Sequence, residues 1–271
     1  MIVIPYLSII IKPYSLIKLK LYDWYIRMKI TVLGSGTILS MPRRKPSSFL
    51  IEQNGQLALL DMGPGILHQL AILNIDYLKP DTIFLTHFHL DHCSDVFPFL
   101  MSRYLMDKES NACLKIFGPV GLKLWYNTHA SLQGKWLSGC QPKIVEIRDE
   151  DIQWANYQIK TFPTEHTNNS IAYRFEGGRS VFFSGDTGLN IELIKFAANA
   201  DLGVLECSHP DAKPVAGHLT PKTAGRFAQE ANFKELAVCH MYPENDISNL
   251  AEQIAEEYKG SISILEDLMN I

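Results

Sequence analysis

The chain has 271 residues, of which 46% are hydrophobic and 20% are charged, and its formal net charge at pH 7 is −4. This composition is typical of a globular protein that is long enough to bury a sizeable core. The negative net charge excludes a surface that is basic throughout, as expected of a protein that holds a long nucleic acid. The run Arg43-Arg44-Lys45 is either a local basic strip or a solvated loop.

The cysteine content argues against stabilisation by disulfides or by a cysteine–zinc site. The chain has five cysteines, an odd number, and no two of them are spaced as CxxC; they are Cys93, Cys113, Cys140, Cys207 and Cys239. A reducing cytoplasm is therefore the simplest compartment to expect.

Residues 1–27 differ from the rest of the chain. The apolar run Met1–Ile11 is too short for a spanning helix, and Pro5 and Pro13 oppose one long helix, so no stable membrane insertion is expected. Three interpretations remain open for this extension: a segment upstream of a start at Met28, an added edge strand or docking segment, and a membrane-surface anchor. A single compact domain is predicted over residues 28–271.

From Met28 onward, short apolar runs alternate with helical patterns. The expected strands are Lys29–Leu33, Ser48–Glu52, Leu57–Leu60, Thr82–Leu85, Leu114–Phe117, Lys143–Glu146, Tyr157–Thr161, Ile171–Phe175, Ser180–Phe183, Leu202–Leu205, Glu235–Val238 and Ile262–Leu265. The expected helices are Ile66–Leu73, Asp95–Met106, Val120–Leu132, Ile191–Ala198, Thr223–Glu230 and Ile247–Tyr258. Asn54-Gly55 and Gly177-Gly178 predict hairpin turns. This order predicts a layered α/β protein.

The strand Thr82–Leu85 leads directly into a cluster of metal-ligand side chains, His87, His89, Asp91 and His92. Side chains two positions apart on extended backbone face the same way, so the first two histidines can share one metal ion. The other two residues follow as the chain turns and can reach a second ion. Imidazole and carboxylate groups are good zinc ligands, so the cluster predicts a metal centre.

Three further candidates lie far apart in the sequence, each just after an expected strand. His166, Asp186 and His240 follow the strands that begin at residues 157, 180 and 235. Alone, each is a weak signal, because a single such residue after a strand is more often an ordinary polar surface or core residue. Together with the cluster they supply the ligands for a two-metal site on a rigid scaffold.

In this order, the motifs resemble those of the metallo-β-lactamase superfamily over essentially all of residues 28–271. The matching motifs are Asp61-Met62-Gly63-Pro64-Gly65, the cluster His87-x-His89-x-Asp91-His92, and the single residues His166, Asp186 and His240. The resemblance implies a four-layer αββα sandwich with the metal ions at one edge. It also implies a hydrolase with two divalent cations, zinc first and manganese or iron as alternatives.

The resemblance further implies a role for each residue. One metal ion is bound by His87, His89 and His166, the other by Asp91, His92 and His240, and Asp186 bridges the two. Asp91 also counts among the catalytic residues. Asp61 is expected to orient a ligand histidine, or alternatively to form only the turn before Gly63.

Other motifs are similar to the ribonuclease Z and phosphodiesterase branch of this superfamily, notably Gly34-Ser35-Gly36-Thr37, Ser184-Gly185-Asp186-Thr187 and Gly217-His218-Leu219-Thr220-Pro221. They imply that His218 is a general acid, with Glu206 orienting it. The alternative is that His218 is only a neighbour of the next helix's N-cap, and Glu206 is equally open.

One departure from ribonuclease Z is that only twenty positions separate His166 from Asp186, which leaves no room for the tRNA-binding arm. A small phosphodiester or short nucleic acid is therefore the expected substrate, cleaved by a hydroxide that bridges the metal ions. The alternatives are a thioester or lactone hydrolase, a ribonuclease Z-type endonuclease, and a non-catalytic metal-binding module. A homodimer is possible for this branch.

The region from Asp95 to Gln141 is rich in aromatic residues and is a candidate substrate wall. Its aromatic residues are Phe97, Phe99, Tyr104, Trp125, Tyr126 and Trp136. Packing in the core is the competing explanation for most of them. Because Trp125 and Tyr126 are neighbours on one expected helix, one of them should be buried and the other exposed.

Overall fold

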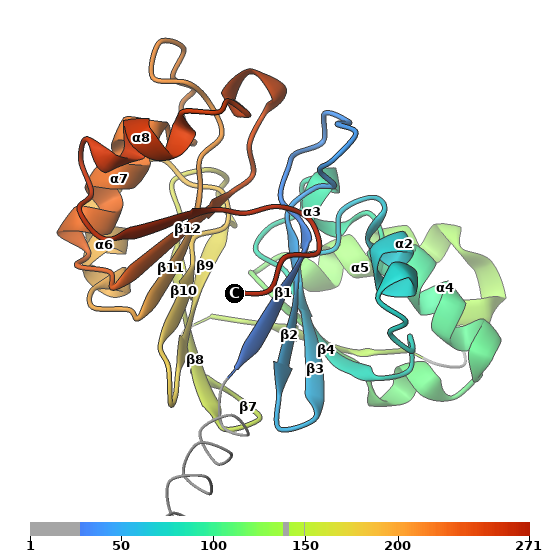
Figure 1. The fold of residues 1–271 in the computed structure, drawn as a ribbon. Helices are drawn as coiled ribbons and strands as arrows, with labels where there is room; N and C mark the ends of the chain where they lie inside the picture. The colour runs from blue at the N-terminus through green and yellow to red at the C-terminus, as the bar shows by residue number, and fades with distance from the viewer. Residues whose placement is uncertain (1–27, 138–140, 149) are drawn as a thin grey trace, which may run out of the picture.

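The computed structural model describes residues 28–137, 141–148 and 150–271. Two β-sheets face each other at the centre, and helices cover the outer face of each (Figure 1). The predicted four-layer αββα sandwich is confirmed. The three interpretations of residues 1–27 concern a segment outside the described residues.

The first sheet holds six strands in sequence order, β1 to β6. They are β1 (Lys29–Gly34), β2 (Ser48–Gln53), β3 (Gln56–Leu60), β4 (Pro80–Phe84), β5 (Lys115–Gly118) and β6 (Lys143–Glu146). β1, β2 and β3 pair antiparallel, whereas β3 to β6 pair parallel. Asn54 and Gly55 both have positive φ, 51° and 78°, and form the expected β2–β3 hairpin turn.

The second sheet holds seven strands in the order β13 to β7. They are β7 (Ile152–Trp154), β8 (Tyr157–Pro163), β9 (Ile171–Glu176), β10 (Val181–Phe183), β11 (Leu202–Glu206), β12 (Glu235–Cys239) and β13 (Ser261–Ile264). β7 was not predicted, because three residues are too few to show an alternating pattern. β10 to β13 run parallel, so their carboxyl ends meet at one edge.

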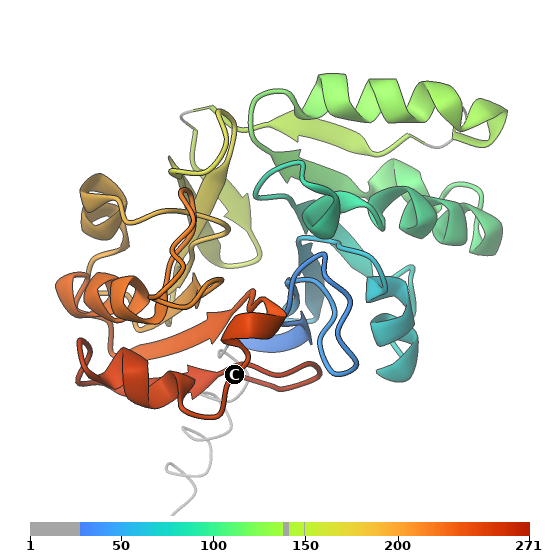
Figure 2. The same ribbon diagram turned by 90° about the horizontal axis from the view of Figure 1, so that it is seen from above.

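Helices of about one to three turns cover the outer faces of the sheets (Figure 2). On the first sheet lie α2 (Ile66–Ile72), α3 (Leu90–Cys93), α4 (Val96–Met106) and α5 (Leu122–Leu132); on the second lie α6 (Ile191–Ala197), α7 (Pro221–Glu230) and α8 (Leu250–Ala255). α7 begins earlier than predicted, because Pro221 occupies its first turn and Thr220 forms a capping box with Thr223. In the described part of the chain, no helix is long and apolar enough to cross a membrane.

Apolar side chains fill each of the three spaces between the layers. Phe84 and Phe175 lie between the sheets, 5.7 Å apart between ring centroids. Phe182 packs against Phe227 below α7, and Phe99 belongs to the cluster below α4. These cores hold both sheets rigidly, so the loops at their shared edge are fixed relative to each other.

The C-terminal segment fastens the loop after β1 to the second sheet. Ile271 N donates to Ile30 O in β1, and Asp267 accepts hydrogen bonds from Ser35 N and Lys45 N at 3.0 and 2.7 Å. Arg44 is buried and pairs with Asp246 at 2.8 Å. The central residue of the basic run Arg43-Arg44-Lys45 is thus part of the framework and not of a solvent-facing basic strip.

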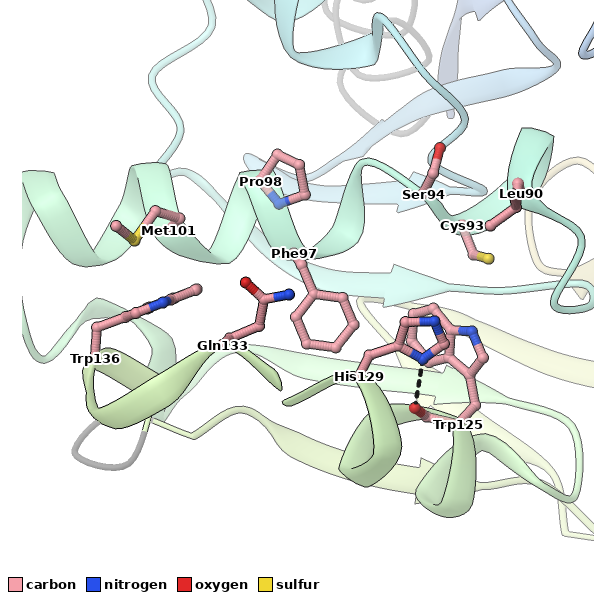
Figure 3. A pocket seen from close by; sticks show the side chains of 10 residues that line it. All are labelled: Leu90, Cys93, Ser94, Phe97, Pro98, Met101, Trp125, His129, Gln133 and Trp136. Carbon is pink, nitrogen blue, oxygen red and sulfur yellow. Dashed lines mark hydrogen bonds between the residues drawn. The ribbon is translucent and has the colours of Figure 1, made fainter. Parts of the chain in front are cut away.

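A pocket of about 400 Å³ lies between α4 and α5 (Figure 3). Rings of Phe97, Trp125 and Trp136 line it, and His129 adds polar atoms. Trp125 is half-buried while Tyr126 is 2% exposed, so the expected contrast between these neighbours is confirmed. The use of this aromatic region as a substrate wall stays a prediction.

Candidate metal centre

The predicted ligand residues meet where strands of both sheets end. His87, His89 and the short helix α3 follow β4, His166 follows β8, Asp186 follows β10 and His240 follows β12. The seven predicted ligand residues belong to groups whose nitrogen or oxygen atoms lie within 4.8 Å of one another. One group is His87, His89, His166 and Asp186, and another is Asp91, His92 and His240; a third, Asp186 with His218 and His240, shares residues with both.

Asp186 faces both groups, with a different carboxylate oxygen toward each. Its Oδ2 lies 3.8 Å from His87 Nε2 and 3.6 Å from His166 Nε2. Its Oδ1 lies 3.4 Å from both His92 Nε2 and His240 Nε2. This arrangement is what a carboxylate that bridges two cations requires.

A buried carboxylate, Asp61, orients two histidines of the centre. It accepts a hydrogen bond from His92 Nδ1 at 2.7 Å, which directs Nε2 of that ring toward Asp186. Its Oδ2 also accepts from the Thr86 hydroxyl, which lies 3.0 Å from His87 Nδ1. Asp61 has a φ of 58°, a left-handed conformation that aspartate tolerates better than most residues. The alternative that it only forms a turn leaves these contacts unexplained.

Glu206 plays the same part on the opposite side of the centre. It accepts directly from His218 Nδ1 at 2.9 Å. It also accepts from the Ser208 hydroxyl, which lies 2.9 Å from His240 Nδ1. Each of the two carboxylates therefore holds one imidazole directly and a second one through a hydroxyl group. Such partners fix the tautomer and direction of ligand histidines.

The loop before α7 contributes to the centre through its backbone as well as through His218. Gly217 O accepts from His166 Nδ1 at 3.1 Å, and His218 lies next to it in the chain. Gly217 has a φ of 81°, and a Cβ there would lie 3.2 Å from the His166 ring. Glycine is required by this backbone conformation, which orients His166 and presents His218 at the same time.

Burial and neighbouring charges shift the pKa values of several groups at the centre, and not all in one direction. Burial lowers the pKa of His87, which keeps the ring neutral. Burial alone would raise the pKa of Asp186, but the adjacent His240 and His92 hold it well below its usual range. Burial lowers the pKa of His218, but its hydrogen bond and ion pair with Glu206 outweigh this effect, so the pKa lies above its ordinary value.

Two buried atoms at the heart of the centre make no hydrogen bond, His87 Nε2 and Asp186 Oδ1. Leaving such groups without a partner costs about 1–3 kcal/mol each, more for a charged one. His87 Nε2 lies 3.8 Å from Asp186 Oδ2, and Asp186 Oδ1 lies 3.4 Å from His92 Nε2 and from His240 Nε2, so a cation held among these atoms would satisfy them. The residues present thus fit divalent-metal binding, with an imidazole-rich donor set.

A sequence model of the family described as "Anti-Pycsar protein Apyc1" matches residues 28–219, which contain every predicted metal ligand except His240. The chain belongs to the Apyc1 family. Ribonuclease Z of Archaeoglobus fulgidus is 25% identical over 304 residues, covering 90% of this chain and 97% of the relative.

Solved structures similar to this Apyc1-family chain share its fold. The metallo-β-lactamase fold protein YhfI from Bacillus subtilis has a TM-score of 0.80 at 24% identity and covers 90% of this chain and 98% of its own. A diphosphatase from the PhnP family has a TM-score of 0.70 at 20% identity and covers 90% and 97%. The predicted assignment to metal-dependent hydrolases of the ribonuclease Z-like branch is confirmed.

Three residues at the centre of this Apyc1-family chain were missed by sequence reasoning. Besides Ser208, His209 stacks on Tyr242 with ring centroids 4.4 Å apart and lies 5.6 Å from the ring of His218. His209 Nδ1 is 3.4 Å from a carboxylate oxygen of Glu244. Serine, histidine and tyrosine next to known motifs carry no spacing signal of their own, although each lies within two residues of Cys207 or His240.

Proposed function

We propose that this chain is a phosphodiesterase with two divalent cations that acts on a small phosphodiester or a short nucleic acid. The main support for this proposal is the position of Asp186. Its Oδ2 lies within 4 Å of His87 and His166, and its Oδ1 lies within 4 Å of His92 and His240. His87, His89 and His166 would hold one cation, and Asp91, His92 and His240 the other. The prevalence of imidazole among these donors favours zinc.

When bound, the two cations lower the pKa of a shared water and neutralise charge on the phosphoryl oxygens. The residues of the chain supply orientation and a proton. Asp61 and Glu206 hold four imidazoles in fixed tautomers through the contacts described above. Because Glu206 keeps Nδ1 of His218 occupied, Nε2 is the atom that can donate a proton to a leaving alkoxide.

The span between His166 and Asp186 supports a small substrate. Its described residues form the antiparallel hairpin β9–β10, and no arm extends from it. A precursor tRNA contacted through such an arm is therefore not favoured. Because a relative is named ribonuclease Z, the second candidate function is that of an RNA endonuclease that binds its substrate without the arm.

The test is a substrate screen with the purified, metal-replete protein. Cyclic nucleotides, short RNA, precursor tRNA and bis-p-nitrophenyl phosphate are compared, together with a thioester and a lactone. We expect turnover of small phosphodiesters and about two metal ions per chain by elemental analysis. Turnover confined to the thioester or lactone, or two bound metal ions without any turnover, would refute the proposal.

A further inference from the structure

The predicted ligands of the metal centre come from both sheets. Four of them follow β4 of the first sheet, and the other three follow β8, β10 and β12 of the second. The group with His87 also holds Asp186, and the group with His92 also holds His240, so each group draws side chains from both sheets. The distance between the sheets at this edge therefore decides whether each group can close around a cation.

A backbone carbonyl just before His87 lacks the partner that the first sheet would normally give it. Leu85 follows β4 and continues its parallel pairing with β5, because Leu85 N donates to Phe117 O at 2.9 Å. In this register, the next donor along β5, which would donate to Leu85 O, is the backbone nitrogen of residue 119. That residue is Pro119, which has no N–H. Leu85 is buried, so its carbonyl needs a donor from elsewhere.

The donor comes from the second sheet. The Tyr173 hydroxyl donates to Leu85 O at 2.8 Å, and both residues are fully buried. Tyr173 lies on β9, between β8 and β10, which are the strands that lead to His166 and Asp186. Burial and the nearby Asp61 carboxylate raise the pKa of Tyr173, so its hydroxyl stays protonated and can donate.

The peptide group that accepts this hydrogen bond is held at its other end by Asp61. Thr86 N donates to Asp61 Oδ1 at 2.8 Å. Because the peptide unit is planar, the contacts at its two ends together fix the direction in which the chain enters His87. Asp61 also holds His92 Nδ1, and the Thr86 hydroxyl lies 3.0 Å from His87 Nδ1. Thr86 O accepts from Ile171 N at 3.0 Å, a second hydrogen bond between the sheets.

We propose that Tyr173 is a positioning residue of the metal centre. By holding the peptide group before His87, its hydroxyl keeps the ligands of the first sheet in place against those of the second, so that each group can close around its cation. Tyr173 is not itself a ligand. This inference rests on the two-cation centre of the proposed function, but not on the identity of the substrate.

The test is Tyr173→Phe, which removes the hydroxyl and keeps the ring in the core between the sheets. Competition with a chromophoric chelator measures the affinity for Zn²⁺, and the visible absorption of bound Co²⁺ reports the geometry of its ligands. We expect the affinity for Zn²⁺ to fall roughly tenfold or more, as when a partner that orients metal ligands is lost. The Co²⁺ bands should shift, and Zn²⁺ should raise the melting temperature less than in the unaltered protein.

The matched control is Tyr258→Phe, because the Tyr258 hydroxyl also donates to a buried backbone carbonyl, Phe233 O, at 2.9 Å. Phe233 precedes β12, at the opposite end of that strand from His240. Both variants lose one buried hydroxyl and should show similar decreases in the melting temperature of the metal-free protein. Only Tyr173→Phe should change the Zn²⁺ affinity and the Co²⁺ spectrum.

A second variant separates the link between the sheets from the simple need of Leu85 O for a donor. Pro119→Ala supplies the missing N–H from the first sheet itself. When it is combined with Tyr173→Phe, the melting temperature should recover in part relative to Tyr173→Phe, with Pro119→Ala alone as the reference. The Zn²⁺ affinity should stay low, because the second sheet remains unlinked. Recovery of the affinity would show that any donor to Leu85 O suffices, and would overturn the proposal.

Two further outcomes overturn the proposal. One is an unchanged Zn²⁺ affinity with an unchanged Co²⁺ spectrum in Tyr173→Phe. The other is an equal loss of affinity in Tyr173→Phe and Tyr258→Phe, because the effect then follows from lower stability. None of these measurements uses turnover, so a protein that binds Zn²⁺ but cleaves no phosphodiester refutes the phosphodiesterase proposal alone.

Discussion

The metal centre and the pocket between α4 and α5 are held together in different ways. In the centre, Asp61 and Glu206 fix four imidazoles through hydrogen bonds of defined direction. In the pocket, rings from two helices pack at tilted angles, and few polar atoms line it. Directional contacts fix the positions of single atoms, whereas packed rings fix only the spacing of the helices. Changes in the centre should therefore alter metal content and kcat, and changes in the pocket should leave both unaltered.

The largest effect is expected for Asp186→Asn. Loss of the charge that faces both ligand groups should lower kcat by roughly 10³-fold or more and reduce bound metal. Steady-state kinetics with bis-p-nitrophenyl phosphate and elemental analysis check this. Asp201→Asn is the control, because Asp201 directly precedes β11 and so lies at the edge of the sheet away from the end of β10. Near-normal kcat in Asp186→Asn would refute a bridging role.

His218→Ala should lower kcat by roughly 10²-fold or more while bound metal is retained. The loss should be greater for an alkyl leaving group than for p-nitrophenolate, which needs less help from an acid. Because Glu206 raises the pKa of His218, activity should fall as the pH rises through this pKa. Glu206→Gln should move that fall to lower pH, and a kcat–pH profile tests it. An unchanged profile would show that another group is the acid.

Ser208→Ala should weaken metal binding by roughly 10- to 100-fold. The substitution removes the hydroxyl that links His240 Nδ1 to Glu206. Competition with a chelator measures the affinity, and Ser102→Ala, at an exposed position on α4, is the control. Unchanged affinity would mean that packing alone orients His240.

The smallest effect is expected in the pocket. His129→Leu removes the hydrogen bond between His129 Nδ1 and Trp125 O. It should lower the free energy of unfolding by no more than about 1.5 kcal/mol, which urea unfolding measures. kcat and metal content should stay the same, because His129 belongs to none of the ligand groups. A fall in kcat or metal content in His129→Leu would contradict the proposed separation of roles between the metal centre and the pocket.

Much of the fold was predictable, because strands buried on one or both faces carry strong apolar patterns. The strand β4, predicted over Thr82–Leu85 and observed over Pro80–Phe84, and the Asn54-Gly55 hairpin were found in this way. The short strand β7 and the end of α8 were not. α8 ends at Ala255, while Tyr258 beyond it donates to Phe233 O at 2.9 Å, a tertiary contact without a local signal.

The sequence by itself determined the family resemblance and predicted which side chains meet at the candidate metal centre, because histidine and aspartate at strand ends form an unusual pattern that can be recognised without a structure. Only the tertiary structure decided which oxygen of Asp186 faces which group, and that Ser208 joins Glu206 to His240. The pocket also belongs to the tertiary structure. Its rings come from helices separated along the chain, and their mutual placement depends on how both pack on the first sheet.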